Sequence, residues 1–185
     1  MLVGKNSLKT EKQEVYMYGT MLFVSTFVGL LSLFFVSIIF FDLVTFLVFL
    51  SFFVPLRLYA GGYHCKNYST CFVVSNILFV LVVLSAKVIY SISWITTVFS
   101  SITFIMVILF SPVTNNANPL SGRRKQINRK KSIYIVTAQF AIINIPIFLQ
   151  LKSIGYYIGL ATCSELSIAI LMMIEIIIER RRKNA

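Results

Sequence analysis

Residues 15–56 read VYMYGTMLFVSTFVGLLSLFFVSIIFFDLVTFLVFLSFFVPL. The run contains one charged residue, Asp42, which divides it into an apolar stretch over 15–41 and a shorter one over 43–56. A helix of about 20 apolar residues crosses the hydrocarbon core of a bilayer, so the first stretch is long enough to span it and the second is short. We therefore predict one membrane-spanning helix, followed after Asp42 by a second apolar helix.

Further apolar stretches occupy about 71–86, 89–110, 133–151 and 154–178. The chain is 58% hydrophobic and only 12% charged, whereas soluble domains carry about 25% charged residues. We predict one domain over 1–185 that is all-α: a polytopic integral membrane bundle of about six transmembrane helices. The polar segment 1–14 is expected to be either an amphipathic surface helix or a tail.

Positive charges test this arrangement. All but two of the 17 Lys and Arg residues fall in four segments, and the exceptions are Lys87 and Lys152. The four segments are 1–14, the loop 57–71, the basic loop 111–132 and the basic tail 179–185. If 43–56 also crosses, all four lie on one side, and cytoplasmic segments collect Lys and Arg. We therefore expect both termini to be cytoplasmic.

Several classes of site are disfavoured by the sequence. The cysteines Cys65, Cys71 and Cys163 and the single histidine, His64, follow no metal-ligand spacing. We therefore expect no metal and no cofactor. A nucleic-acid partner is also not expected, because the basic residues lie between apolar runs and not on a soluble scaffold.

The stretch most suggestive of chemistry is 57–71, RLYAGGYHCKNYSTC, which we interpret as a catalytic loop. An imidazole can take the proton of a thiol and deliver it to a leaving group, so His64 and Cys71 form a candidate base and nucleophile. Seven residues of continuous helix would hold them about 10 Å apart. We therefore predict a break near 66–69, with Cys71 at the start of the third span, where the helix dipole favours a thiolate.

Other residues of this region have less specific interpretations. Gly61 and Gly62 suit a loop in which the backbone approaches a neighbour closely or adopts positive φ. Arg57 is a candidate to bind a substrate carboxylate or a lipid phosphate. Glu165, inside the sixth apolar stretch, is a functional candidate because ionisable residues in membranes are costly. It is also one of several candidates to orient His64.

The residues alone leave alternatives open. His64 is compatible with a merely interfacial role, Cys71 with packing, and Cys65 with being the nucleophile. A small transporter or peptide exporter would use Glu165 and have no need of the thiol. A scaffold for another membrane protein would need neither His64 nor Cys71.

Two motifs resemble the accessory gene regulator B (AgrB) family. The first is R-x-x-A-G-G-x-H, here Arg57 to His64, followed by Cys71 seven residues later. The second is S-P-V-x-N-x-x-N-P-L over 111–120, followed by basic residues before the fifth apolar stretch. The resemblance covers nearly the whole chain.

The resemblance implies an integral membrane cysteine endopeptidase of a Gram-positive bacterium, multi-pass in the cytoplasmic membrane, with its active site facing the cytoplasm. Such enzymes act as homodimers and cut the C-terminal part from an AgrD-type precursor through a thioester. An internal Cys or Ser of the precursor then closes a thiolactone or lactone ring, which matures into a quorum-sensing peptide.

Carried over by motif position, Cys71 is the nucleophile and His64 the base. Cys65 departs from the small residue that the family often has after the histidine. The resemblance supplies no third catalytic residue. Because the basic segments share the predicted cytoplasmic side, we further expect an acidic part of the precursor to meet either residues 123–131, which include Arg123, Arg124 and Lys125, or the basic residues 180–183.

Overall fold

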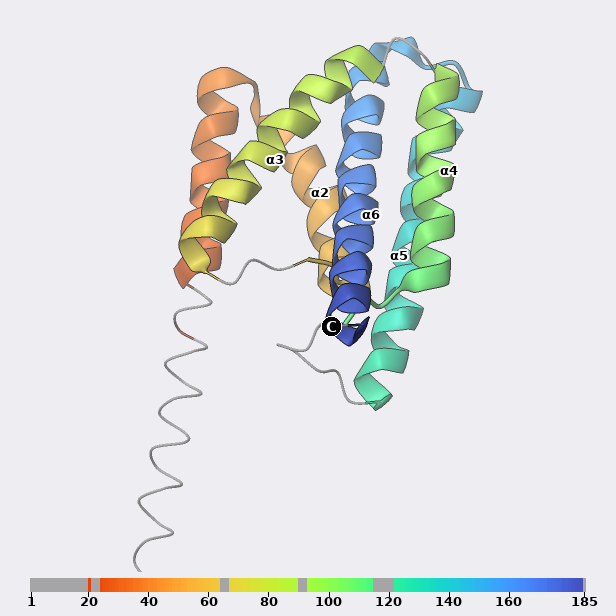
Figure 1. The fold of residues 1–185 in the computed structure, drawn as a ribbon. Coiled ribbons are helices and arrows are strands. Elements are labelled where there is room, and N and C mark those ends of the chain that lie inside the picture. The colour runs from red at the N-terminus through yellow and green to blue at the C-terminus, as the bar shows by residue number, and fades with distance from the viewer. Residues whose placement is uncertain (1–19, 21–23, 64–66, 90–92, 115–121, 185) are drawn as a thin grey trace, which may run out of the picture.

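The structure is a computed structural model that describes residues 20, 24–63, 67–89, 93–114 and 122–184. Every regular element in these residues is a helix, as predicted (Figure 1). We call Val24–Phe40 the first described helix. The others are α2 (Leu43–Ala60), α3 (Tyr68–Ile89), α4 (Ser93–Phe110), α5 (Gly122–Phe148), the single 3₁₀ turn η1 (Lys152–Ile154) and α6 (Gly155–Asn184).

Four helices are long and apolar enough to cross a membrane, namely Leu43–Ala60, Ser69–Ile89, Gly122–Phe148 and Gly155–Arg182. Two shorter apolar helices, Val24–Phe40 and Trp94–Phe110, accompany them. Together they form an all-α membrane bundle. The apolar stretch 43–56 is short for a membrane span, but the helix that contains it, α2, continues beyond Leu56 to Ala60.

Asp42 makes the corner between the first two helices. The first described helix ends at Phe40, and α2 begins at Leu43 with Asp42 as its N-cap. The Asp42 carboxylate accepts a hydrogen bond from the Thr45 backbone N–H at 2.6 Å and another from the Thr45 hydroxyl at 3.0 Å. An N-cap carboxylate satisfies amides that the helix leaves without partners. The single charge in residues 15–56 therefore marks a turn, as predicted.

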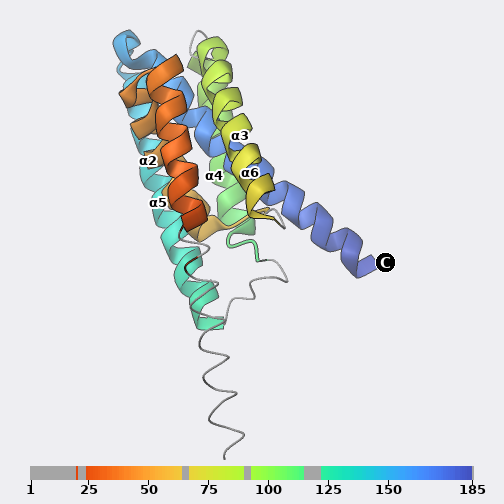
Figure 2. The same cartoon turned by 90° about the vertical axis from the view of Figure 1, so that its left-hand side faces the viewer.

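Helix α6 lies at the centre of the bundle and contacts α2, α3 and α4. Its middle is buried on nearly every side and is rich in small residues, including Ala161, Thr162, Ser164 and Ser167. Small side chains let helices in membranes approach closely. Figure 2 shows the last turns of α6 extending beyond the other helices.

The basic segments are more helical than predicted. The predicted loop 57–71 contributes 57–60 to α2 and 68–71 to α3, whereas 122–132 of the basic loop and 179–184 of the tail belong to α5 and α6. Lys and Arg are good helix formers, so a helix can continue past its apolar part into water.

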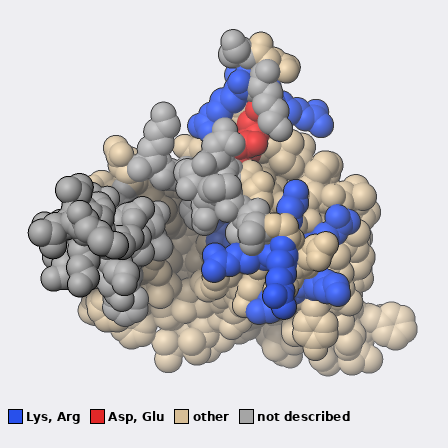
Figure 3. Space-filling model, turned by 90° about the horizontal axis from the view of Figure 1, so that it is seen from below, with Lys and Arg blue, Asp and Glu red and all other residues tan. Residues whose placement is uncertain are grey.

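Most of the described basic residues gather at one end of the molecule, where α2, α4 and α6 end and α5 begins (Figure 3). Lys87, in the last turn of α3, lies at the opposite end, and its ammonium group sits 5.5 Å from the centre of the Phe41 ring. The clustering of charge at one end agrees with the sequence. Which side of the membrane that end faces stays a prediction, and Lys5, Lys9, Lys12 and Lys66 lie outside the described residues.

Candidate active site

The two sequence motifs meet in space at the basic end of the bundle. The Val113 backbone N–H donates to the Ala60 carbonyl at 2.8 Å, and Gly61 pairs with Val113 as an isolated parallel bridge. Arg57, in the last turn of α2, donates through one guanidinium nitrogen to the Gly61 carbonyl at 2.8 Å and through another to the Tyr63 carbonyl. We call the segment 60–63 with these contacts the glycine strap.

The second attachment of the glycine strap is to α6. The Tyr63 backbone N–H donates to the Leu171 carbonyl at 3.0 Å. Gly62 has φ +117° and is packed so closely that a Cβ there would lie 3.2 Å from backbone atoms of Leu171 and Met172. Gly61 has φ +80°, and a Cβ there would overlap the Val113 carbonyl oxygen. The sequence suggested either positive φ or close backbone approach, and both glycines show both features.

The strap leads directly to His64. His64 and Cys65 lie outside the described residues, so the geometry of the predicted His64–Cys71 pair stays a prediction. Cys71 is described: it lies in the first turn of α3, where its backbone N–H donates to the Asn67 carbonyl at 3.0 Å, and its side chain is half-buried. The expected position of Cys71 at the start of the third span is confirmed.

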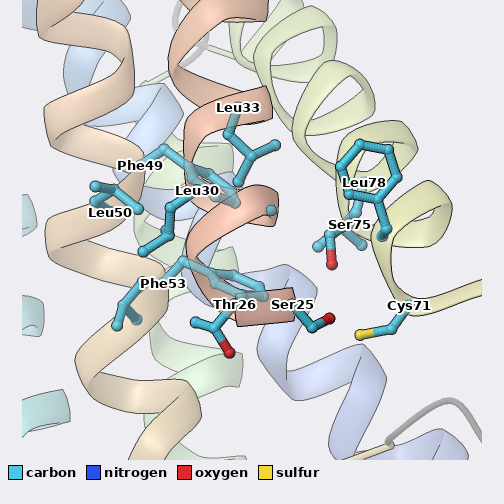
Figure 4. Close-up of a pocket in the computed structure, with 13 residues that line it drawn as sticks. Ser25, Thr26, Leu30, Leu33, Phe49, Leu50, Phe53, Cys71, Ser75 and Leu78 are labelled. Atoms are coloured by element: carbon cyan, nitrogen blue, oxygen red, sulfur yellow. The ribbon is translucent and has the colours of Figure 1, made fainter. Parts of the chain in front are cut away.

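Cys71 lines a cavity of about 250 Å³ between the first described helix, α2 and α3. Figure 4 shows the Cys71 thiol at one end of this cavity, pointing toward the hydroxyl of Ser25 on the first described helix. The cavity lining comprises Ser25, Thr26, Gly29, Leu30, Leu33, Phe49, Leu50, Phe53, Val54, Cys71, Phe72, Ser75 and Leu78. Apart from Cys71 and three hydroxyl-bearing residues, these side chains are apolar. We call this cavity the Cys71 pocket.

The sequence alone did not identify Ser25, Thr26, Gly29 or Ser75 as pocket residues. A partial signal exists, because Ser25 and Gly29 are four residues apart, as are Cys71 and Ser75. Residues at this spacing share one face of a helix. Which helix faces which could not be known without the packing of the bundle.

The remaining predicted site residues lie elsewhere. Glu165 is fully buried in α6, outside the lining of the Cys71 pocket. Six residues, roughly 9 Å of helix rise, separate it from Leu171, where α6 holds the strap. Arg123, Arg124 and Lys125 are exposed in the first turn of α5. Within the described part of the chain, no group of three or more His, Cys, Asp or Glu residues is placed to hold a metal ion.

Comparison with known proteins agrees with the motifs. A family model described as "AgrB: Accessory gene regulator B" matches residues 1–177. An AgrB-like protein of Clostridium perfringens (strain SM101, type A) is 26% identical over 161 residues, covering 81% of this chain and 71% of that protein. A second AgrB-like protein of the species (strain 13, type A) is 24% identical over 154 residues, covering 80% and 69%. No solved structure matches the chain significantly. Because the family model covers almost the entire sequence, the chain belongs to the accessory gene regulator B family.

Proposed function

We propose that this protein is a membrane-embedded cysteine endopeptidase that cleaves an AgrD-type precursor through a Cys71 thioester and promotes closure of a thiolactone or lactone ring. Family membership associates the chain with quorum-sensing peptide processing. The observation that carries the finer proposal is the placement of Cys71, half-buried in the first turn of α3 and facing an apolar pocket.

The proposed reaction has two acyl transfers. His64 takes the Cys71 proton, and the sulfur attacks the scissile carbonyl. The C–N bond then breaks, and the leaving amine receives the proton from His64. An internal thiol or hydroxyl of the precursor next gives its proton to His64 and attacks the thioester. The ring bond forms, the C–S bond breaks, and His64 returns the proton to the Cys71 sulfur. No oxidant or cofactor is needed.

The Cys71 pocket supplies what the second transfer requires. A thioester in water hydrolyses, whereas ring closure needs it to survive until the internal nucleophile arrives. Most of the pocket wall, formed by three helices, is apolar, and we propose that this wall limits the access of water to the thioester. A nucleophile carried on the same peptide then competes by its high effective concentration.

The glycine strap is proposed to set the approach of His64 to Cys71. Arg57 donates hydrogen bonds to the carbonyls of Gly61 and Tyr63, and these bonds hold the chain immediately before the histidine. We therefore propose a positioning role for Arg57, and its binding of a substrate carboxylate or a lipid phosphate stays a prediction. The homodimer and the cytoplasmic orientation of the site belong to the same proposal.

Filling the Cys71 pocket should slow processing without unfolding the bundle. A Cβ added at Gly29 meets nothing within 4 Å, so Gly29→Phe is expected to place its ring in the pocket. We expect processing to fall about tenfold or more, which corresponds to about 1.4 kcal/mol. Cleavage rates in membranes measure this, with Gly29→Ala as the control that adds only a methyl group. Wild-type rates in Gly29→Phe would remove the pocket from the proposed mechanism.

Charge at the start of α5 is expected to govern capture of the precursor. Replacing Arg123, Arg124 and Lys125 together by Glu should lower processing about tenfold, because an acidic peptide segment is then repelled and not attracted. The control is the charge-conserving triple variant Arg123→Lys, Arg124→Lys and Lys125→Arg. Rates would be compared at low and high salt, since screening weakens exposed charge interactions. Equal rates in the two triple variants would exclude this role.

Trapping the acyl-enzyme tests the proposed function directly. A precursor whose internal nucleophile is replaced by Ala cannot close its ring, so the thioester should accumulate. Mass spectrometry of the digested enzyme is expected to find the precursor fragment attached to the peptide that contains Cys71, removable by hydroxylamine. A fragment attached to Cys65 would move the nucleophile, and the absence of any adduct would contradict thioester chemistry.

A further inference from the structure

Buried polar atoms without partners concentrate in one part of the bundle. Among the described residues, five buried side-chain oxygens have no hydrogen-bond partner. Four of them belong to Thr103 on α4, Gln139 on α5 and Glu165 on α6: one hydroxyl, one amide oxygen and both carboxylate oxygens. All three residues are at least 95% buried. Burying such atoms without partners is costly, so their grouping calls for a physical reason.

The register of α4 and α5 places Thr103 and Gln139 at about the same height. The antiparallel pair is fixed near one end by the contact between the Ser111 and Ser132 hydroxyls and farther along by a 3.1 Å hydrogen bond from the Asn144 amide to the Ser100 hydroxyl. Residues that face one another between these two contacts include positions near 103 and 140.

Glu165 reaches the same layer from α6. Ile168 belongs to the buried core cluster that also contains Val107 of α4 and Val136 of α5. Each of the three polar residues lies about one helical turn from the cluster member on its own helix. The pairs are Thr103 with Val107, Gln139 with Val136 and Glu165 with Ile168. Because α4 and α6 run toward the basic end and α5 runs away from it, all three displacements point toward the opposite end of the bundle.

The groups without partners in this layer are all oxygen atoms that can accept hydrogen bonds. The Gln139 amide nitrogen donates to the Ser51 and Phe52 carbonyls of α2, at 3.2 and 3.0 Å, so Gln139 has only its oxygen left to offer. Neither carboxylate oxygen of Glu165 has a hydrogen-bond partner among the described residues. The layer therefore combines several oxygen acceptors with one carboxylate. A carboxylate buried in this way is neutralised either by a proton or by a compensating positive charge.

We propose that Thr103, Gln139 and Glu165 form a binding site for one monovalent cation of the sodium type. Carboxylate, amide and hydroxyl oxygens are the ligands that hard cations prefer. One monovalent ion neutralises the single carboxylate, whereas a divalent ion would leave a buried net positive charge. The site joins α4, α5 and α6, whereas the Cys71 pocket lies between the first described helix, α2 and α3. The proposal is therefore independent of the peptidase mechanism.

Binding of radioactive ²²Na⁺ to the purified full-length protein in lipid nanodiscs tests this site, with choline chloride keeping the ionic strength constant. We expect about one sodium ion per chain, displaced by unlabelled NaCl and not by choline. Affinity should fall at least tenfold in Glu165→Gln, Gln139→Leu and Thr103→Val. Glu175→Gln, an acid-to-amide change on the same helix, and Cys71→Ala should both bind as wild type.

Two outcomes would overturn the site. The first is the absence of sodium-specific binding to folded wild-type protein. The second is an infrared carbonyl band of a protonated carboxylic acid that persists in NaCl at neutral pH and disappears in Glu165→Gln, because a proton would then neutralise Glu165. If Glu165→Gln does not fold, the Thr103→Val and Gln139→Leu variants still decide the question, because neither removes a charge.

Discussion

Replacing Cys71 by Ala is expected to lower precursor cleavage about 10⁴-fold or more, because the variant lacks the thiol that is proposed to form the thioester. His64→Ala should cause a loss of similar order, since residues that act as one catalytic unit are not additive. The measurement is co-expression with the AgrD-type precursor, with gel shift and mass spectrometry to detect the cleaved product. Both variants keep the glycine strap, so both should accumulate as folded membrane protein.

Cys65→Ala is the matched control, because it removes a thiol next to His64 and leaves Cys71 in place. It should cleave at a rate close to wild type. Cleavage that survives in Cys71→Ala and is lost in Cys65→Ala would reassign the nucleophile. Cleavage that depends on neither cysteine would contradict a thiol peptidase, and a transporter or scaffold would tolerate all three substitutions.

Gly61→Val is expected to prevent correct folding of the site and to abolish processing. The new side chain would overlap the Val113 carbonyl oxygen, and a β-branched residue at φ +80° is strained by about 1–3 kcal/mol before the overlap is counted. We expect the total destabilisation to exceed about 3 kcal/mol, a large fraction of typical folding stability. Thermal unfolding followed by circular dichroism, together with the amount of protein in membranes, measures the effect.

Gly122→Ala provides the comparison for Gly61→Val. Gly122 begins α5, and a Cβ added there meets nothing within 4 Å. It should unfold at the wild-type temperature and process normally. A Gly61→Val protein that is as stable and active as Gly122→Ala would show that the contact between Gly61 and Val113 does not hold the site.

Much of the fold was predictable from the sequence, because the length of an apolar stretch and the position of a single charge determine the local structure. The break at Asp42 follows from its N-cap chemistry. The end of α2 and the start of α5 differ from the limits of the apolar stretches in the sequence. Hydropathy shows where a helix leaves the apolar region, but it does not show where the helix itself ends. Arg57 and the basic residues from 123 onward continue their helices into a polar environment.

The candidate site was predictable in part. The spacing from Arg57 to Cys71 identified the segment, and positive φ at the glycines was anticipated. The partners of the glycines, Val113 and Leu171, were not, because backbone contacts between segments distant in the chain leave no periodic pattern. The same holds for Ser25 and Gly29, which reach the Cys71 pocket through packing alone.

The hydrogen bond from Tyr63 to Leu171 also bears on the order in which the protein is made. A ribosome releases Tyr63 long before it releases Leu171, more than 100 residues later in the chain. Until Leu171 has emerged and joined the bundle, the amide next to His64 lacks its native acceptor. The nascent chain therefore carries both proposed catalytic residues without the native support for the segment between them. If the proposed function is right, full processing activity requires that synthesis has passed Leu171.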